Sequence, residues 1–496
     1  MKRTISFLAA LLFAFSYPGF TYFTFASEVY NHEDARAAIE FALAAYGGDE
    51  AITAKLQEFG YDTICTYNYD DSYNENSSAF ALALHGREAV LVICGTRSEE
   101  WLGNFNIGDN EITDTHYSFS AAADEVLLKT EKYLEEHATI PEKLIVTGHS
   151  RGAAVANLVA ARMDDGKCDG VTRDTLCAYT YATPTVTLTD ETNSERYNNI
   201  FNIVNTEDLV TLVPLPRWGY KRYGIDIFLP TLANDENYLN YKSRMIQKYS
   251  ELFGTAPDMF DSMSSAEAAD AIYALCPNVD TYYNKEYYFN ERVGNITVRE
   301  FCAKVAAVMV DSSDADAQSM ILSGLGNDFR QISRYLINNT ELIAAVHRTE
   351  AYLAWMNSLS EDELFEGRGS KAVSIISRDN VQINLKNEDG EVLALVSMIK
   401  NKKPSLTLQV AASTGVEFVS LYLPESLMCE AEISSEGDAS FSLSLSFLTG
   451  TAIASRRVNY FGVPIKSGEP ARFNTVTFFD GILPCEDFLP SVNYEA

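Results

Sequence analysis

The sequence predicts a mixed α/β fold followed by a region of antiparallel strands. Over about the first 230 residues, short apolar runs typical of buried strands alternate with helical patterns. The clearest example is the apolar run 144–147, which leads directly into a helix of small residues at 153–158. After residue 370 the apolar period becomes two, as in Val381, Ile383 and Leu385. The 496 residues are enough for two or three folding units.

A glycine-flanked serine joins that strand to that helix. The pentapeptide Gly148-His149-Ser150-Arg151-Gly152 fits a nucleophile elbow, a sharp turn that exposes a reactive serine. Side chains two residues before and after the serine would collide in such a turn, so Gly148 and Gly152 are needed there. The unpaired amides at the start of the helix favour a developing oxyanion. Ser150 is therefore the candidate nucleophile, and an ordinary buried serine is the alternative.

A nucleophilic serine needs a base and an acid that orients the base. In hydrolases built on this turn the chain order is serine, acid, histidine. Of six histidines, His347 alone follows Ser150, which makes it the candidate base. The run 199–205 reads as a buried strand, and Asp208 just after it is the candidate acid, with Glu207 in reserve. The alternatives are a turn-capping role for Asp208 and a purely structural one for His347.

Three blocks of this sequence resemble those of the class 3 lipases, which have an α/β-hydrolase fold. They are Gly95-Thr96-Arg97-Ser98 leading to Trp101-Leu102-Gly103-Asn104, the elbow itself, and the segment 205–216 with Trp218-Gly219-Tyr220 behind it. In addition, the segment 347–355 resembles the histidine loop and following helix of bacterial members. The similarity covers about residues 30–230 and 340–360.

The resemblance implies a hydrolase of carboxylic esters, a lipase or esterase that acts on a lipid or other acyl ester. Such an enzyme needs no cofactor and no metal. The resemblance also implies an oxyanion hole made by the backbone amides of Thr96 and Arg151, unless Thr96 only begins a loop. Two positions depart from the family pattern. Arg151 stands where leucine is frequent, and Cys94 stands where many relatives have an arginine, so a salt bridge beneath the oxyanion loop is in doubt.

Between the candidate acid and base lies a segment with helical periodicity, which predicts a cap over the site. We therefore expect a hydrolase core at 27–233, a helical cap insertion at 234–340, the histidine loop and last helix of the core at 341–366, and an antiparallel β-sandwich at 370–496. The sandwich is expected to contact a surface or a carbohydrate, or else to act only as a stabilising spacer.

The N-terminus has the pattern of a secretory signal peptide. A charged start, Met1-Lys2-Arg3, precedes a long apolar run, and small residues lead up to Ala26. We expect residues 1–26 to be removed, leaving a bacterial protein that is secreted or held in the cell envelope, with no membrane span. An uncleaved anchor is the alternative.

The net charge of the chain limits the kinds of partner that it can bind, and its cysteine content bears on disulfides. The net charge of −31 disfavours binding to nucleic acid and to anionic membranes. Eight cysteines permit disulfides in an exported protein, with Cys168–Cys177 and Cys429–Cys485 as candidate pairs. The sequence shows neither a Cys/His spacing typical of zinc sites nor an EF-hand loop.

Two other functions remain open at this point. The same fold resemblance fits an esterase that acts on acylated or feruloylated polysaccharide. From a different class, the chain is a non-catalytic surface-binding protein with a degenerate hydrolase core. The complete set of serine, aspartate and histidine argues against this second alternative.

Overall fold

The structure is a computed structural model that describes the core of the chain and the strands of its C-terminal part. The described residues are 29–70, 74, 76–96, 104, 114–206, 208–214, 219–231, 235, 237–257, 292–293, 296–297, 340–366, 371–377, 382–386, 390, 392–397, 405–406, 411–414, 419–424, 430–435, 437–449, 454–474 and 492–495. The predicted signal peptide and most of the predicted cap lie outside these ranges.

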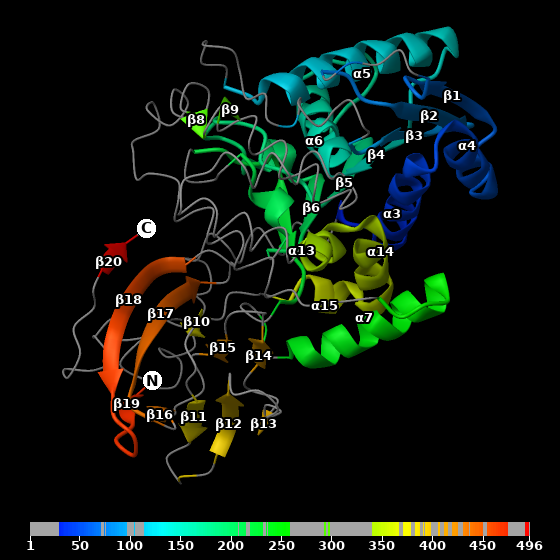
Figure 1. Cartoon of the computed structure of the whole chain (residues 1–496). Helices are drawn as coiled ribbons and strands as arrows, with labels where there is room; N and C mark the ends of the chain where they lie inside the picture. Colours follow the sequence, from blue (N-terminus) through cyan, green and yellow to red (C-terminus); the bar gives the residue numbers. More distant parts are fainter. Residues whose placement is uncertain are drawn as a thin grey trace, which may run out of the picture.

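The core is a seven-stranded sheet with the strand order β1-β2-β3-β4-β5-β6-β7 (Figure 1). The strands are β1 Thr63–Tyr67, β2 Phe80–His85, β3 Glu88–Ile93, β4 Lys143–His149, β5 Leu176–Tyr181, β6 Ile200–Val204 and β7 Ile225–Phe228. The pairs β1·β2 and β2·β3 are antiparallel, whereas all pairs from β3 to β7 are parallel. Parallel strands bring their carboxyl ends to one edge, which is where sites form in such sheets. The predicted α/β core is confirmed.

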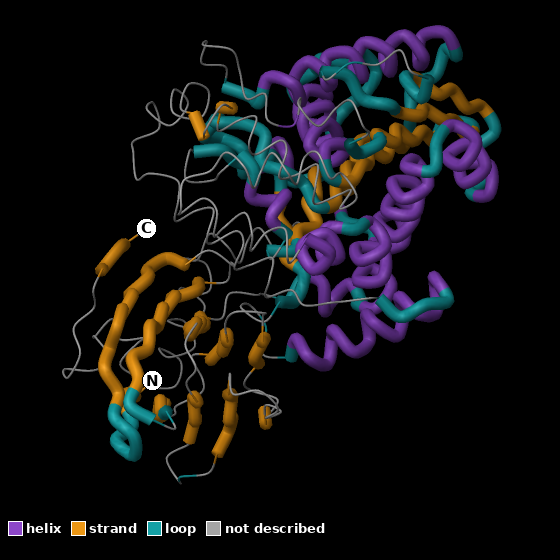
Figure 2. The backbone as a smooth tube through the Cα atoms, in the orientation of Figure 1, coloured by secondary structure: helices purple, strands orange, loops and turns teal. Residues whose placement is uncertain are grey.

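Helices cover both faces of this sheet, as Figure 2 shows. They are α3 His32–Tyr46, α4 Asp49–Glu58, α5 Tyr117–Glu136, α6 Arg151–Asp164, α7 Tyr238–Phe253, α13 Thr340–His347, α14 Thr349–Ser358 and α15 Glu361–Leu364, with short 3-10 turns η3 Glu195–Tyr197 and η4 Leu209–Leu212. The side chains of β3 alternate between two cores. Val90 and Val92 pack in the core with α3 and α14, whereas Leu91 and Ile93 pack in the core with α5 and α6. Burial on both faces accounts for the continuous apolar runs of these strands.

The first helix of the predicted insertion, α7, packs against the core. Its apolar residues Tyr238, Tyr241 and Met245 recur at helical spacing and are buried in the cluster that contains Trp355 of α14. The helical pattern predicted at this point corresponds to a helix in the structure, and α7 packs on the core through these residues. The rest of the predicted cap is described only at β8 Arg292–Val293 and β9 Ile296–Thr297, which form a small antiparallel pair.

The residues that the structure describes after 370 lie mostly in antiparallel strands, as the period of two predicts. One sheet has six strands in the order β14-β15-β10-β17-β18-β20, and another has five in the order β13-β12-β11-β16-β19. Their bounds are β10 Lys371–Ser377, β11 Gln382–Lys386, β12 Val392–Ser397, β13 Ser405–Leu406, β14 Ala411–Thr414, β15 Val419–Pro424, β16 Glu430–Ser434, β17 Ala439–Thr449, β18 Ala454–Ile465, β19 Ala471–Asn474 and β20 Val492–Glu495. In β11 the apolar Ile383 and Leu385 are buried. The assembly of the two sheets into a sandwich stays a prediction.

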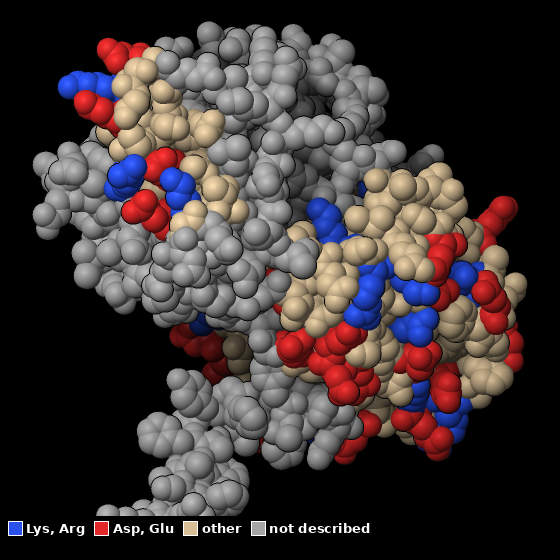
Figure 3. Space-filling model, turned by 90° about the horizontal axis from the view of Figure 1, so that it is seen from below, with Lys and Arg blue, Asp and Glu red and all other residues tan. Residues whose placement is uncertain are grey.

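Surface charges of both signs are interspersed over the described residues visible in Figure 3. Part of this pattern is made of ion pairs, such as Lys248 with Glu251 on α7 and Arg244 with Glu363 of α15. Among the helices in the described ranges, none combines the length and apolar content needed to cross a lipid bilayer.

One predicted disulfide is wrong. Cys168 and Cys177 both carry free thiols, and burial raises the pKa of Cys168 to about 11. Cys94 is wholly buried in the core, as expected of a small apolar side chain. The other candidate pair, Cys429 with Cys485, lies outside the described residues.

A half-buried carboxyl group, that of Asp164, ends helix α6 on the side of the sheet away from the strands' carboxyl ends. Asp164 accepts a hydrogen bond from the Asn199 side chain at 3.1 Å, and its second oxygen is buried without a partner. Burial raises the pKa of Asp164 to about 7, an effect that the Asn199 hydrogen bond only partly offsets. The C-terminal end of a helix also disfavours negative charge.

Candidate active site

Ser150 lies on a sharp turn between β4 and α6. Its backbone has φ 58° and ψ −127°, a conformation that costs energy in a residue with a side chain. A Cβ atom added at Gly148 would lie 2.4 Å from the carbonyl carbon of Gly152, and one at Gly152 would lie 2.2 Å from the carbonyl oxygen of Ile93. Both positions therefore accept only glycine, because the atoms in the way belong to the backbone.

The two predicted oxyanion residues belong to neighbouring elements. Thr96 follows β3, Arg151 is the first residue of α6, and β3 pairs with β4 so that Ile93 lies opposite Gly148. The Asn104 side chain donates a hydrogen bond to the Thr96 hydroxyl at 2.9 Å. The convergence of the two amides on one oxygen stays a prediction, and residues 97–103 lie outside the described part of the chain.

Three predicted residues from distant segments meet at the carboxyl edge of the sheet. The His347 Nε2 lies 2.9 Å from the Ser150 Oγ, and the His347 Nδ1 lies 2.7 Å from an oxygen of Asp208. A carboxylate can only accept, so Nδ1–H donates to Asp208. The Nε2 lone pair is then left for the serine hydroxyl. This geometry suits proton transfer from Ser150 to His347.

Asp208 is fixed by further donors that the sequence analysis missed. It follows β6, is 1% exposed, and accepts a hydrogen bond from the Val210 amide at 3.0 Å. The Tyr352 hydroxyl donates to the carboxylate oxygen that also bonds His347, at 2.9 Å, and itself accepts from the Asn205 amide. Burial and the Asp208 charge raise the pKa of Tyr352 well above its usual value, so this donor keeps its proton. The reserve acid, Glu207, lies outside the described residues.

Residues 90–218 match the family model of class 3 lipases. The match runs from β3 through the elbow to the acid loop and includes Thr96, Ser150 and Asp208. His347 lies beyond the matched residues, yet its imidazole ring lies within hydrogen-bond distance of Ser150 and Asp208. No curated protein and no solved structure matches the chain. The mostly parallel sheet and the class 3 lipase match together fit an α/β hydrolase.

A second histidine, His149, contacts the backbone of His347. His149 is buried, and its Nε2 lies 2.8 Å from the carbonyl oxygen of His347 while its Nδ1 lies 2.9 Å from the Tyr46 hydroxyl. Burial, with a smaller contribution from the neighbouring His347, lowers the pKa of His149 well below its usual value. Neutral His149 thus donates Nε2–H to the carbonyl and accepts from Tyr46. From the sequence alone, His149 is recognisable only as part of the nucleophile elbow.

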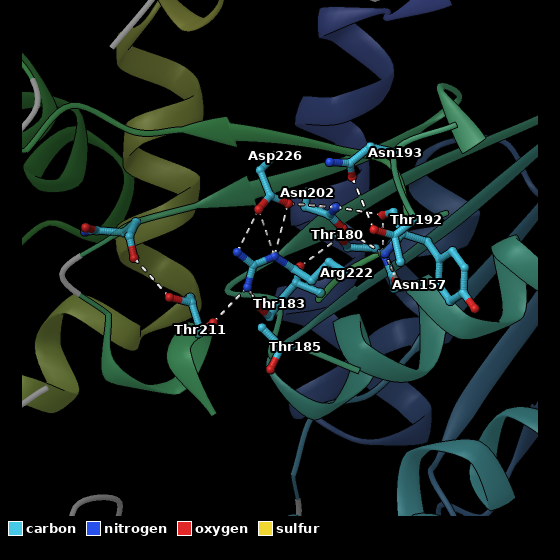
Figure 4. Close-up of polar contacts among 12 residues, drawn as sticks. Asn157, Thr180, Thr183, Thr185, Thr192, Asn193, Asn202, Thr211, Arg222 and Asp226 are labelled. Atoms are coloured by element: carbon cyan, nitrogen blue, oxygen red, sulfur yellow. Dashed lines mark hydrogen bonds and ion pairs between the residues drawn. The ribbon is translucent and has the colours of Figure 1, made fainter. Parts of the chain in front are cut away.

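A partly buried polar network joins Arg222 to Thr211, which lies in the turn just after Asp208 (Figure 4). Arg222 pairs with Asp226 of β7 at 2.8 Å and donates to the carbonyl oxygens of Thr183 and Thr211, at 3.0 and 2.7 Å. The Thr211 hydroxyl in turn donates to the carbonyl oxygen of Asp208 at 2.8 Å. Arg222 therefore connects the loops after β5 and β6 to β7. No local pattern in the sequence marks this role.

The described residues contain no cluster of three or more histidine, cysteine or acidic side chains that could hold a metal ion.

Proposed function

We propose that this protein hydrolyses carboxylic esters through an acyl-enzyme, as a lipase or esterase. The observation that carries this proposal is the continuous hydrogen-bonded chain from Ser150 through His347 to Asp208. The class 3 lipase match over residues 90–218 supports a lipase-like hydrolase independently of that geometry.

In the proposed reaction, the Ser150 Oγ bonds to the ester carbonyl carbon while His347 Nε2 takes the serine proton. The tetrahedral intermediate carries its negative charge on the former carbonyl oxygen, which the Thr96 and Arg151 amides stabilise. His347 then returns the proton to the departing alcohol as the ester bond breaks. Water attacks the acyl-enzyme by the same route, with His347 as base, and releases the acid and free Ser150. Asp208 orients the imidazole and stabilises its charged form.

The wider organisation is part of the same proposal. A signal peptide at 1–26 would make the enzyme a secreted or envelope protein of a bacterium, acting on neutral lipid or other acyl esters. The insertion at 234–340 would cover the site, and a β-sandwich at 370–496 would contact a surface or act as a spacer. The net charge of −31 supports a substrate that is not strongly anionic.

The test is ester hydrolysis by Ser150→Ala and His347→Ala variants of the full chain. A series of p-nitrophenyl esters of rising acyl length, with a feruloyl ester included, separates lipase, short-chain esterase and polysaccharide-type esterase. We expect kcat to fall by roughly 10⁴-fold or more in both variants with circular dichroism unchanged. A fluorophosphonate should label Ser150 in the wild type.

A matched control is Ser358→Ala, which removes another buried hydroxyl whose partner is the carbonyl oxygen of Trp355. We expect it to keep its kcat within about twofold of wild type. A wild type that hydrolyses none of the esters and resists labelling would support the non-catalytic alternative. Labelling at another serine would show that the nucleophile is misassigned.

A further inference from the structure

A buried arginine directly follows the proposed nucleophile. Arg151 is 1% exposed and is the first residue of α6. The start of a helix carries partial positive charge, so a cation there is disfavoured, and burying a guanidinium group adds a desolvation cost. The side chain must therefore make strong contacts in this position.

The guanidinium group is held between three segments. Nη1 donates to the Asn104 side-chain oxygen at 3.1 Å, and Nη2 donates to the carbonyl oxygen of Ser77 at 3.1 Å and to the Ser118 hydroxyl at 3.0 Å. Its central carbon lies 5.5 Å from the centre of the Phe119 ring. These partners come from the start of α5, the loop before β2 and the oxyanion side of the site.

Asn104 continues the chain of contacts towards the oxyanion loop. Its side-chain oxygen accepts from Arg151, while its side-chain nitrogen donates to the Thr96 hydroxyl at 2.9 Å. Its carbonyl oxygen lies 3.0 Å from the Nε2 of the buried His116. Because both ends of the amide are engaged, Asn104 connects Arg151 to Thr96 in one fixed orientation.

We propose that the Arg151 side chain is a positioning residue that sets the oxyanion hole, by holding the Thr96 loop against the start of α6 through Asn104. This inference rests on the proposed ester hydrolysis and names a determinant of it. The Arg151 backbone would supply one oxyanion donor and its side chain would hold the other. The thiol of Cys94, beside Gly95, donates instead to the carbonyl oxygen of Ala45 at 3.4 Å.

Arginine suits this role because of its shape. Its planar fork presents several N–H groups in fixed directions, so one side chain bonds Asn104 and Ser77 at once. A lysine would keep the charge but offer a single nitrogen on a flexible stem. Since catalytic groups need placement within about 0.5 Å, loss of this brace should act on the transition state more than on substrate binding.

The main test compares Arg151→Met, Asn104→Ala and the double variant. We expect each single variant to lower kcat by roughly 10- to 100-fold, with KM within about threefold of wild type, because removing one oxyanion donor outright costs 10²- to 10³-fold. If the two residues act through one chain of contacts, the double variant should lose no more than the worse single variant. Losses that multiply in the double variant would overturn the proposal.

The matched control is Arg162→Met on the same helix. Arg162 also joins α6 to α5, through the Ser120 carbonyl oxygen and the Asp124 carboxylate, but at the other end of the helix. We expect this variant to lower the melting temperature while its kcat stays within about twofold of wild type. An equal loss of kcat in Arg162→Met would show that Arg151 acts only through stability.

Two further readouts separate this inference from the proposed function. A boronic acid forms a tetrahedral adduct on serine with an oxygen in the oxyanion position, so its inhibition constant should rise in Arg151→Met by about the factor that kcat falls. Hydrogen exchange at the Thr96 and Asn104 amides, which needs no turnover, should accelerate in Arg151→Met and not in Arg162→Met. If hydrogen exchange at these amides is unchanged in Arg151→Met, the proposed positioning role of Arg151 is wrong. A wild type that a fluorophosphonate leaves unlabelled at Ser150 would overturn the proposed function, and the exchange result would still decide the brace.

Discussion

Two strands of the central sheet, β4 and β6, each present a proposed catalytic residue at the carboxyl end, but they fix it in different ways. At the end of β4, Ser150 is held by the backbone, in a turn where the neighbouring glycines touch main-chain atoms. At the end of β6, Asp208 is held by side chains, namely Tyr352 directly and Arg222 through Thr211.

The difference indicates how each part should respond to change. A backbone-held residue leaves no free space, so a single added methyl group disturbs the main chain itself. A side-chain network distributes the task over several hydrogen bonds, each worth about 1 kcal/mol. We therefore expect one substitution at the end of β4 to cause a large loss of stability, whereas single substitutions in the network at the end of β6 should each cause a smaller loss.

The largest effect is expected for Gly148→Ala. The added Cβ would lie 2.4 and 2.5 Å from the carbonyl carbon and oxygen of Gly152 and 2.8 Å from the nitrogen of Ala153. Because these are all main-chain atoms, we expect a loss of about 3 kcal/mol in the free energy of unfolding, measured by urea titration with circular dichroism.

The control for that variant is Gly437→Ala, where nothing lies within 4 Å of the added Cβ. It should change the unfolding free energy by less than about 0.5 kcal/mol. If Gly148→Ala is as stable as this control, the elbow is not fixed by its backbone.

A smaller effect is expected for Arg222→Met. This change leaves Asp226 without its ion pair and the carbonyl oxygens of Thr183 and Thr211 without this donor. We expect a loss of about 2 kcal/mol in unfolding free energy and a roughly tenfold lower kcat, because the loop that holds Asp208 loosens. Denaturant titration and ester kinetics measure the two effects.

Arg196→Met is the matched control, since Arg196 pairs with Asp165 at 2.8 Å but lies more than half exposed. A surface pair of this kind should contribute little to stability, because solvent screens it. Equal effects of the two arginine variants would contradict a special role for Arg222.

The smallest effect is expected for Tyr352→Phe. The ring stays in place, and only the hydroxyl that donates to Asp208 is removed. Since the hydrogen bond to the charged Asp208 is lost, together with the one accepted from the Asn205 amide, we expect kcat to fall about tenfold with KM unchanged. Tyr197→Phe removes a similar hydroxyl bond to a carboxylate, that of Asp165, away from the site. It should leave kcat unaltered, and an equal fall in both variants would mean that Tyr352 does not position the acid.

The arrangement at the carboxyl end of β4 is easier to predict from the sequence than the one at the carboxyl end of β6, and the reason is physical. The elbow is a local arrangement in which strand, glycines, serine and helix follow one another within about fifteen residues. His347 is the candidate base because no other histidine follows Ser150. The α/β core also follows from local apolar patterns, and the structure confirms it.

The supporting contacts could not be predicted, because they join residues far apart in the sequence. Arg222, Tyr352 and the side chain of Arg151 find their partners only after the strands and helices have packed. A buried histidine such as His149 likewise carries no local sign of whether it bonds a neighbour's carbonyl oxygen. The cap and the sandwich remain predictions from periodicity.

The half-buried Asp164 carboxyl at the end of α6 couples folding to proton uptake. In the unfolded chain Asp164 would ionise near pH 4, whereas burial raises its pKa to about 7 in the folded protein. Between these two values the folded state binds a proton that the unfolded chain releases, so the contribution of Asp164 to stability is full below about pH 4 and is lost as pH rises towards 7. At this residue, a mildly acidic medium favours the native state.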